Sequence, residues 1–498
     1  MAINQQLTIC CGTQIKEILM DNSVKNIILI ITDQMRGDCV SYTGHPVVNT
    51  PNLDELASEG VTFTSAYSPC PSCIASRASL FTGLSPSSHG RLGYRDCIPW
   101  NYNNMLPEVL SRFGWQTHCT GKTHFYPQRK HCGFDSLDSY EGTQNFDGLY
   151  VNDYHDWLEE KTNGQIKEVD HGLSFNSWDA RPSHLPEHLH NNSWVATKSI
   201  EFLRRRDKTR PFFLNLSFHR PHSPIDPPQI YADMYKDSEL PDIPHGDWAE
   251  KHAVPTYAID AWHGKLETKR MDRMRRLYFA QISHIDNQIG RILRYLKTNK
   301  IGPNIIIFTS DHGEMLGDHN LFRKTYAYEG SAKIPLIISN AGSVKGRIVT
   351  DPVVIEDLYP TILDLAGIPE TEEIDGLSLA PFCDSKNYSL KRNYVHGEHS
   401  KCYDEEEAMQ FLTDGKEKYI WFTKTGKEQL FDLSADPQEL HNLSSNPAYS
   451  QRLNYWRLNL IIQLKNRTGD GMSDGKRLIP GVLVPSVRKP LKEVRMQM

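Results

Sequence analysis

The chain has 498 residues, of which 39% are hydrophobic and 23% are charged, and its formal net charge is -6. This length exceeds what one small core can organise, so we expect a large domain and a smaller one. The composition is that of an ordinary globular protein. It argues against a nucleic-acid-binding protein, which needs excess positive charge to neutralise phosphates.

Residues 1–24 are predicted to be an N-terminal extension outside the core. Their one apolar piece, residues 7–11, is too short for the hydrophobic centre of a signal peptide. No run of about 18 apolar residues predicts a membrane span. The ten cysteines show neither a small disulfide framework nor a paired zinc-ligand spacing. We therefore expect a cytoplasmic protein with mostly reduced thiols, with neither a membrane nor a nucleic acid as partner.

Strands and helices are predicted to alternate from residue 25 to residue 387. Short apolar runs without polar alternation are typical of parallel strands that are covered on both faces. Such runs occupy 26–32, 116–120, 212–217, 304–309 and 335–339. Helical patterns occupy 52–59, 75–82, 105–113, 194–205, 271–297 and 355–366. We expect an α/β catalytic domain whose large, doubly wound, mixed and mainly parallel sheet is flanked by helices.

A small C-terminal α+β subdomain is predicted for residues 388–470. Short strand patterns separated by polar turns indicate an antiparallel sheet. They occupy 394–396, 408–413, 419–423 and 429–432, and a helical pattern follows at 446–465. Residues 471–498 are predicted to be a C-terminal tail.

Polar side chains follow the predicted strands at the edge where open α/β sheets bind ligands. They are Asp33 and Gln34, Lys122 and His124, His219 and His222, and Asp311 and His312. Each alone could be a helix cap or a solvated side chain. Two carboxylates and a histidine at neighbouring strand ends, however, predict a divalent-cation site.

A loop that carries Cys73 is predicted to lead into a helix that carries Arg77 one turn later. Free N–H groups and the positive end of the helix dipole would stabilise an anion there, and Arg77 can swing back onto the same place. The pattern favours a nucleophile that attacks an anionic ester. A redox-active pair of Cys70 and Cys73 is an alternative, although no small thioredoxin-like unit precedes it.

Several motifs together resemble one family. Residues 73–77 (CIASR) followed by Thr82-Gly83 resemble the signature C-x-[PA]-S-R-x-x-x-x-T-G of type I, formylglycine-dependent sulfatases of the alkaline phosphatase superfamily. Residues 121–124, 211–224, 309–317 with Lys324, and 430–443 resemble further family segments. The resemblance extends over most of residues 25–445 and is greatest to cytoplasmic arylsulfatases of anaerobic gut bacteria. It implies an arylsulfatase-like sulfuric-ester hydrolase that acts on a small sulfated aryl or carbohydrate substrate.

The resemblance also implies the cofactors. Cys73 would be oxidised to formylglycine (3-oxoalanine), whose hydrate attacks sulfur, expels the alcohol and then eliminates sulfate. A single divalent ion would assist, usually Ca²⁺ in this family, with Mg²⁺ or Mn²⁺ as alternatives. The implied metal ligands are Asp33, Gln34, Cys73, Asp311 and His312.

The resemblance further assigns catalytic roles. Arg77 and Lys122 would hold the formylglycine hydrate and sulfate oxygens, and Lys324 would bind sulfate from the opposite side. His222 would protonate the leaving oxygen and His124 would be the base that releases sulfate, although these two roles could be exchanged. Such a site is expected to be polar and to face solvent.

Maturation and substrate follow from neighbouring residues. Ala75 stands where proline is commoner in this family, and the resemblance implies maturation by an oxygen-independent radical enzyme, which tolerates alanine there. Gln34 and His312 also occur in relatives that cleave phosphonate or phosphate esters, so such a hydrolase is an alternative. A non-catalytic sulfated-glycan-binding relative is another, if Cys73 is never oxidised. The insert 135–190 could shape a sugar pocket; His396, Glu398 and His399 either border the cleft or form a solvated turn.

Overall fold

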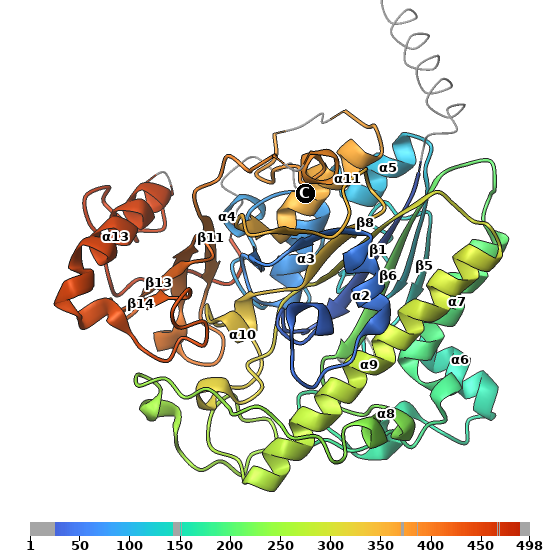
Figure 1. The fold of residues 1–498 in the computed structure, drawn as a ribbon, viewed down its shortest axis with the longest axis horizontal. Helices are drawn as coiled ribbons and strands as arrows, with labels where there is room; N and C mark the ends of the chain where they lie inside the picture. Colours follow the sequence, from blue (N-terminus) through green and yellow to red (C-terminus); the bar gives the residue numbers. More distant parts are fainter. Residues whose placement is uncertain are drawn as a thin grey trace, which may run out of the picture.

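A computed structural model describes residues 25–142, 150, 152–369, 373–385, 387–465, 467 and 469–488. The predicted N-terminal extension and the last ten residues of the predicted tail lie outside this part of the chain. The fold consists of a large sheet covered by helices and a small sheet beside it (Figure 1).

The large sheet has eight strands in the order β5-β4-β6-β1-β7-β8-β2-β9. These are β1 (Asn26–Asp33), β2 (Gly60–Phe63), β4 (Gln116–Gly121), β5 (Ser136–Ser139), β6 (Phe212–Pro221), β7 (Asn304–Ser310), β8 (Leu336–Ser339) and β9 (Arg347–Val349). Neighbours run parallel except where β8 pairs with β7 and β2. The predicted mixed, mainly parallel sheet is confirmed, but the expectation that residues 335–339 form a parallel strand was wrong.

Strand β1 shows why its sequence lacks polar alternation. Ile28 and Ile30 belong to one buried apolar cluster, whereas Ile27, Leu29 and Ile31 belong to another on the opposite face. Successive strand residues point to opposite faces, so both faces of β1 must be apolar. Helices cover both faces (Figure 1). The first cluster includes α2 (Pro51–Ser58), α7 (Asn191–Arg205) and α9 (Thr268–Thr298), and the second includes α3 (Cys73–Thr82), α5 (Leu106–Arg112) and α11 (Leu358–Leu365).

The predicted helices are present, with shifted ends. The helix expected at 75–82 already begins at Cys73, and the one expected at 355–366 is a 3-10 turn followed by α11. Short elements complete the large domain: α4 (Pro86–His89), α6 (Asp153–Thr162), α8 (Gln229–Met234), α10 (Glu329–Ala332), α12 (Pro381–Asp384), and the parallel pair β3 (Ala66–Tyr67) and β10 (Val353–Val354).

The second sheet is antiparallel, as predicted, and α13 packs against it. Its strands are β11 (Val395–His399), β12 (Met409–Thr413), β13 (Glu417–Phe422) and β14 (Glu428–Asp432), followed by α13 (Ser450–Leu464). Trp421 and Trp456 lie in the core between sheet and helix. After α13 the chain returns to the large domain, where the backbone N–H of Leu92 donates to the Ser486 carbonyl at 2.8 Å.

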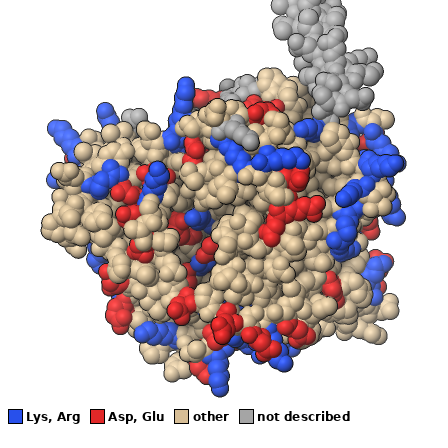
Figure 2. All heavy atoms as spheres, in the orientation of Figure 1, with Lys and Arg blue, Asp and Glu red and all other residues tan. Residues whose placement is uncertain are grey.

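The surface carries both signs of charge. Basic and acidic side chains are interspersed over the face seen in Figure 2. This mixture mirrors the composition, which has 55 basic and 61 acidic residues. Within the part of the chain that the structure describes, no helix is both long and apolar enough to cross a bilayer.

A buried ion pair ties β11 to the segment after α13. Both terminal guanidinium nitrogens of Arg467 lie 2.8 Å from carboxylate oxygens of Glu398, and the two side chains are 5% and 3% exposed. Burial alone would raise the pKa of Glu398, but the charge of Arg467 and the hydrogen bonds lower it to about 2.

Replacing Arg467 with methionine is expected to lower the free energy of unfolding by about 3–5 kcal/mol, because it leaves a buried carboxylate unpaired. Tryptophan fluorescence during urea unfolding would measure the loss.

The pKa of Glu398 is lowered on folding, so the pair stabilises the protein above pH 4.5 and this contribution is lost as the pH falls towards 2. Arg477→Met is the control, because its pair with Asp474 is exposed; a change above ~0.5 kcal/mol there, or none at Arg467, would contradict the prediction.

Candidate active site

The ends of β1 and β7 bring two carboxylates together. These parallel strands pair in register up to Thr32 and Ser310, so Asp33 and Asp311 follow at the same edge of the sheet. The start of α3 places Cys73 beside them, with its Sγ 3.5 Å from Asp33 Oδ1 and 3.1 Å from His312 Nε2. All four side chains are buried, and each offers a ligand atom within 4.8 Å of the others.

This donor set fits a divalent cation. His312 Nδ1 lies 2.8 Å from the Gly313 carbonyl, so the neutral ring, which is the form that binds a metal ion, carries its proton on Nδ1 and keeps a lone pair on Nε2 facing the cluster. Burial, and then the charge of Asp33, raise the pKa of Asp311. A cation between the two carboxylates would compensate both effects.

Gln34 lies at the border of this cluster in a left-handed conformation, with φ 67°. Few residues other than glycine adopt that conformation, and such strain is often found at functional sites. Its side-chain oxygen accepts a hydrogen bond from Lys324 Nζ at 2.6 Å, and its side-chain nitrogen donates to Glu314. Lys324 and Glu314 therefore fix the amide of the predicted ligand.

Cationic side chains hold the carboxylates. Lys122 is ion-paired with Asp33, and Arg77 Nε donates to Asp311 Oδ2 at 2.9 Å. A second guanidinium nitrogen of Arg77 donates to the Lys122 carbonyl and to Ser217 Oγ, both at 2.9 Å, and its third finds no hydrogen-bond partner among the described residues. Arg77 is completely buried. It thus lies beneath the carboxylates rather than on the pocket wall.

The surroundings of Cys73 stabilise an anion. Burial and Asp33 alone would raise the pKa of its thiol, but the charges of Lys122, Lys324 and His312 hold that pKa well below its ordinary value. Cys73 is only 1% exposed, so the expectation of a solvent-facing residue was wrong. The side chain lies at the bottom of a pocket because α3 begins at this residue and packs into the core.

The pocket above Cys73 has a volume of about 150 Å³. It is lined by Ser72, Cys73, Tyr94, Lys122, His124, Phe175, Asn176, His222, Arg323, Lys324, Thr325, Cys402 and Tyr403. Phe175 and Asn176 come from the insert 135–190. The small subdomain contributes Cys402 and Tyr403, not His396, Glu398 or His399. The carboxylate of Glu398, near the end of β11, instead forms a buried ion pair with Arg467. This pair keeps the Glu398 side chain away from the cleft.

Two histidines face this pocket from different elements. His124 Nε2 lies 2.9 Å from Asp96 Oδ1, and its backbone N–H donates to Glu141 Oε1 at 3.0 Å. Burial and Lys122 alone would lower the pKa of His124, but hydrogen bonds with Asp96 and Cys73 raise it to about 9. His222 Nδ1 lies 2.7 Å from the Ser223 carbonyl. Sequence reasoning missed Asp96 and Glu141, which no local pattern distinguishes.

The redox alternative for Cys70 and Cys73 finds no support. All eight cysteines in the described part of the chain are free, including both of these. Burial, and then the charge of Glu398, raise the pKa of the Cys70 thiol well above its ordinary value. Cys70 therefore lacks the stabilised thiolate of an attacking redox cysteine, and the lowered pKa of Cys73 comes from the charges of the candidate active site rather than from Cys70.

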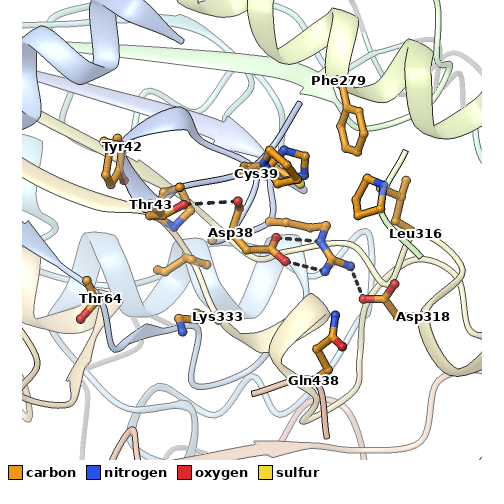
Figure 3. Close-up of a pocket in the computed structure, with 18 of the residues that line it drawn as sticks. Asp38, Cys39, Tyr42, Thr43, Thr64, Phe279, Leu316, Asp318, Lys333 and Gln438 are labelled. Atoms are coloured by element: carbon orange, nitrogen blue, oxygen red, sulfur yellow. Dashed lines mark hydrogen bonds and ion pairs between the residues drawn. The ribbon is translucent and has the colours of Figure 1, made fainter. Parts of the chain in front are cut away.

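A larger cavity, of about 520 Å³, lies beside the loop after β1 (Figure 3). Arg36 pairs there with Asp38 and Asp318, each at 2.7 Å, so two carboxylates neutralise its charge. None of the predicted site residues lines this cavity. The pocket above Cys73 is smaller, but Lys122 and Lys324 both line it beside the carboxylate cluster. We therefore take it, and not the larger cavity, as the candidate active site.

Comparison with known proteins agrees with this geometry. Residues 25–368 match the family model described as Sulfatase. The chain belongs to the sulfatase family. Residues 317–465 of this sulfatase also match a model described as N-sulphoglucosamine sulphohydrolase, C-terminal. The sulfatase is 43% identical to an arylsulfatase of Clostridium perfringens (strain 13 / Type A) over 480 residues, which cover 93% of this chain and 99% of the relative.

Solved structures resemble the sulfatase over most of its length. A phosphonate monoester hydrolase of Agrobacterium radiobacter has a TM-score of 0.75 and 25% identity, covering 89% of this chain and 96% of that one. A protein in complex with its substrate D-glucosamine-2-N,6-O-disulfate has a TM-score of 0.73 and 22% identity, covering 91% and 100%. The second likeness shows the fold alone. The predicted membership of the sulfatase family is confirmed.

Proposed function

We propose that this sulfatase hydrolyses sulfuric esters of small aryl or carbohydrate alcohols through a formylglycine made from Cys73. The observation that carries the proposal is the position of Cys73 at the start of α3, at the bottom of a pocket that Lys122 and Lys324 also line. A sulfate ester brings a negative charge, which this pocket is built to accept. The arylsulfatase relative supports the same reaction.

The formylglycine would supply, as its hydrate, a hydroxyl nucleophile. A divalent ion held by Asp33, Gln34, Cys73, Asp311 and His312 would supply Lewis acidity. We propose Ca²⁺, with Mg²⁺ and Mn²⁺ as alternatives, because the carboxylates of Asp33 and Asp311 are oxygen ligands that suit all three ions.

The remaining chemistry belongs to the protein's own side chains. Lys122 and Lys324 would hold sulfate oxygens, and Arg77 would keep Asp311 in place from beneath. His124 and His222 would share the roles of the acid that protonates the leaving oxygen and the base that releases sulfate, and the raised pKa of His124 and the lowered pKa of His222 favour His124 as the acid and His222 as the base. We retain 25–387 and 388–470 as the proposed catalytic domain and small subdomain.

Modification of Cys73 is the first point to test. We propose an oxygen-independent radical maturation enzyme that acts in the cytoplasm. Mass spectrometry of a peptide containing Cys73 should show a loss of about 18 Da, which the conversion of thiol to aldehyde requires. An unmodified Cys73 in protein from its native host would instead support the non-catalytic glycan-binding alternative.

A phosphonate or phosphate ester hydrolase is the second candidate function. The structural likeness to the phosphonate monoester hydrolase favours it, together with the positions of Gln34 and His312 beside the carboxylates. Sulfate, phosphonate and phosphate esters of the same phenol should be compared by kcat/KM. We expect the sulfate ester to be the best substrate; a higher value for either phosphorus ester would overturn the first proposal.

A further inference from the structure

Arg323 is a basic side chain in the active-site pocket to which the proposed reaction assigns no role. It lines the pocket together with Lys122 and Lys324. Lys122 pairs with Asp33, whereas Lys324 donates to the neutral amide of Gln34. A sulfate monoester carries one negative charge, which the two lysines already accommodate. The charge of Arg323 therefore exceeds what one ester group requires.

The backbone around Arg323 brings two consecutive basic side chains to one pocket. Consecutive side chains of an extended segment point to opposite sides, yet Arg323 and Lys324 both line the pocket. Arg323 has a left-handed backbone conformation with φ 69°, and so has Thr325 with φ 87°. Such conformations are costly for residues that carry a Cβ and persist mainly at functional sites. The N–H of Met315 fixes the turn by donating to the Arg323 carbonyl at 2.7 Å.

The guanidinium of Arg323 is held by three segments but is not neutralised. One of its terminal nitrogens donates to the Asn176 carbonyl at 3.0 Å and to the Asp260 carbonyl. Its central carbon lies 5.8 Å from the centre of the Tyr403 ring. In the part of the chain that the structure describes, no carboxylate forms an ion pair with Arg323. Carbonyls and an aromatic ring orient a guanidinium but leave its full charge.

A ligand in the pocket can reach this charge. The Nε of Arg323 is enclosed and has no acceptor among the described residues. The second terminal nitrogen also lacks an acceptor among them, but it is not enclosed. Asn176 and Tyr403, which hold the guanidinium, line the same pocket. An oriented N–H donor with a full positive charge is a strong partner for an anion.

We propose that Arg323 binds a second anionic group, a carboxylate or a sulfate, on the alcohol part of the substrate and so selects doubly charged esters. The proposal rests on the ester hydrolysis proposed above and narrows its substrate class. The pocket has a volume of only about 150 Å³, so an ester group at Lys324 and an anion at Arg323 belong to one small molecule. Arg323 contacts no reacting atom, so its contribution falls on KM more than on kcat.

The test uses pairs of aryl sulfates that differ in one charge. Each of the ortho, meta and para carboxyphenyl sulfates is compared with the uncharged carbamoylphenyl sulfate, and resorcinol disulfate is compared with 3-hydroxyphenyl sulfate. We expect the wild type to show a kcat/KM at least ~10-fold higher for the charged member of at least one pair. The pair that shows this preference identifies the second anion as carboxylate or sulfate.

Two substitutions then assign the preference to Arg323. Arg323→Gln keeps an N–H group for the carbonyls of Asn176 and Asp260 but removes the charge. It should lower the ratio of kcat/KM between the charged and uncharged members about 30-fold, mainly through KM. Arg323→Lys keeps the charge and should recover part of this ratio. If Arg323→Gln does not fold, Arg323→Met gives the same comparison.

Each alternative has its own outcome. A purely structural role of Arg323 predicts equal losses on both members of a pair, so an unchanged ratio in Arg323→Gln would overturn the proposal. A wild type that hydrolyses the uncharged sulfates but prefers no charged partner would overturn it too, while the sulfatase proposal would stand. A wild type inactive on every sulfate would overturn the sulfatase proposal instead, and the same pairs made as phosphonate esters would then decide the role of Arg323.

Discussion

Replacing Cys73 with alanine is expected to lower turnover of an aryl sulfate by at least ~10⁴-fold while the protein stays folded. Alanine offers no group that can become the nucleophile. The fold should survive because alanine is small and favours the helix that begins at this position. Initial rates would measure the first effect, and thermal unfolding followed by circular dichroism the second.

Cys70→Ala is the matched control for this experiment. Cys70 is also buried and lies three residues earlier, but it does not line the pocket. We expect its turnover to stay within about threefold of wild type, since the change removes packing rather than a reacting group. A Cys73→Ala protein with near-normal turnover would refute the proposed nucleophile.

Replacing Asp311 with asparagine is expected to lower both metal content and turnover, the latter by at least ~10³-fold. Asparagine keeps the shape of the side chain but removes the charge that would hold a cation and that pairs with Arg77 at 2.9 Å. Elemental analysis after dialysis would measure the bound metal, and added Ca²⁺ or Mn²⁺ would test recovery.

Asp318→Asn is the control for the loss of a buried charge. Asp318 pairs with Arg36 at the other cavity, so its replacement removes the same charge outside the candidate site. We expect that variant to keep its metal even if its melting temperature falls. Full metal occupancy and full activity in Asp311→Asn would refute the assignment of this ligand.

Sequence patterns predicted the central strands because those strands are long and apolar on both faces. They missed β2, β5 and β9, which have only four, four and three residues. Apolar composition also does not determine direction. Residues 336–339 are as apolar as β7, yet β8 runs antiparallel, since its direction depends on how the chain returns to the sheet rather than on its side chains.

The candidate site was predictable where its residues follow long strands. Asp33 and Asp311 must meet because their strands are parallel neighbours. Other contacts depend on tertiary packing: Asp96 reaches His124 from a loop 28 residues earlier in the chain, without a distinguishing pattern. The burial of Cys73 was also not predictable, because it follows from the packing of α3 rather than from the residues beside it.

That burial would restrict when the proposed modification of Cys73 can take place. An enzyme that modifies Cys73 needs access to the residue, yet in the folded protein Cys73 lies at the start of a helix whose ten residues are all buried. Part of the chain that follows this helix is covered only late in synthesis. The backbone N–H of Leu92 donates a hydrogen bond to the carbonyl of Ser486, which is made long after it. At ~5–20 residues per second, the ribosome needs on the order of a minute to extend the chain from Leu92 to Ser486. If Cys73 is modified as proposed, its maturation would compete with folding, and conditions that slow folding should increase the modified fraction.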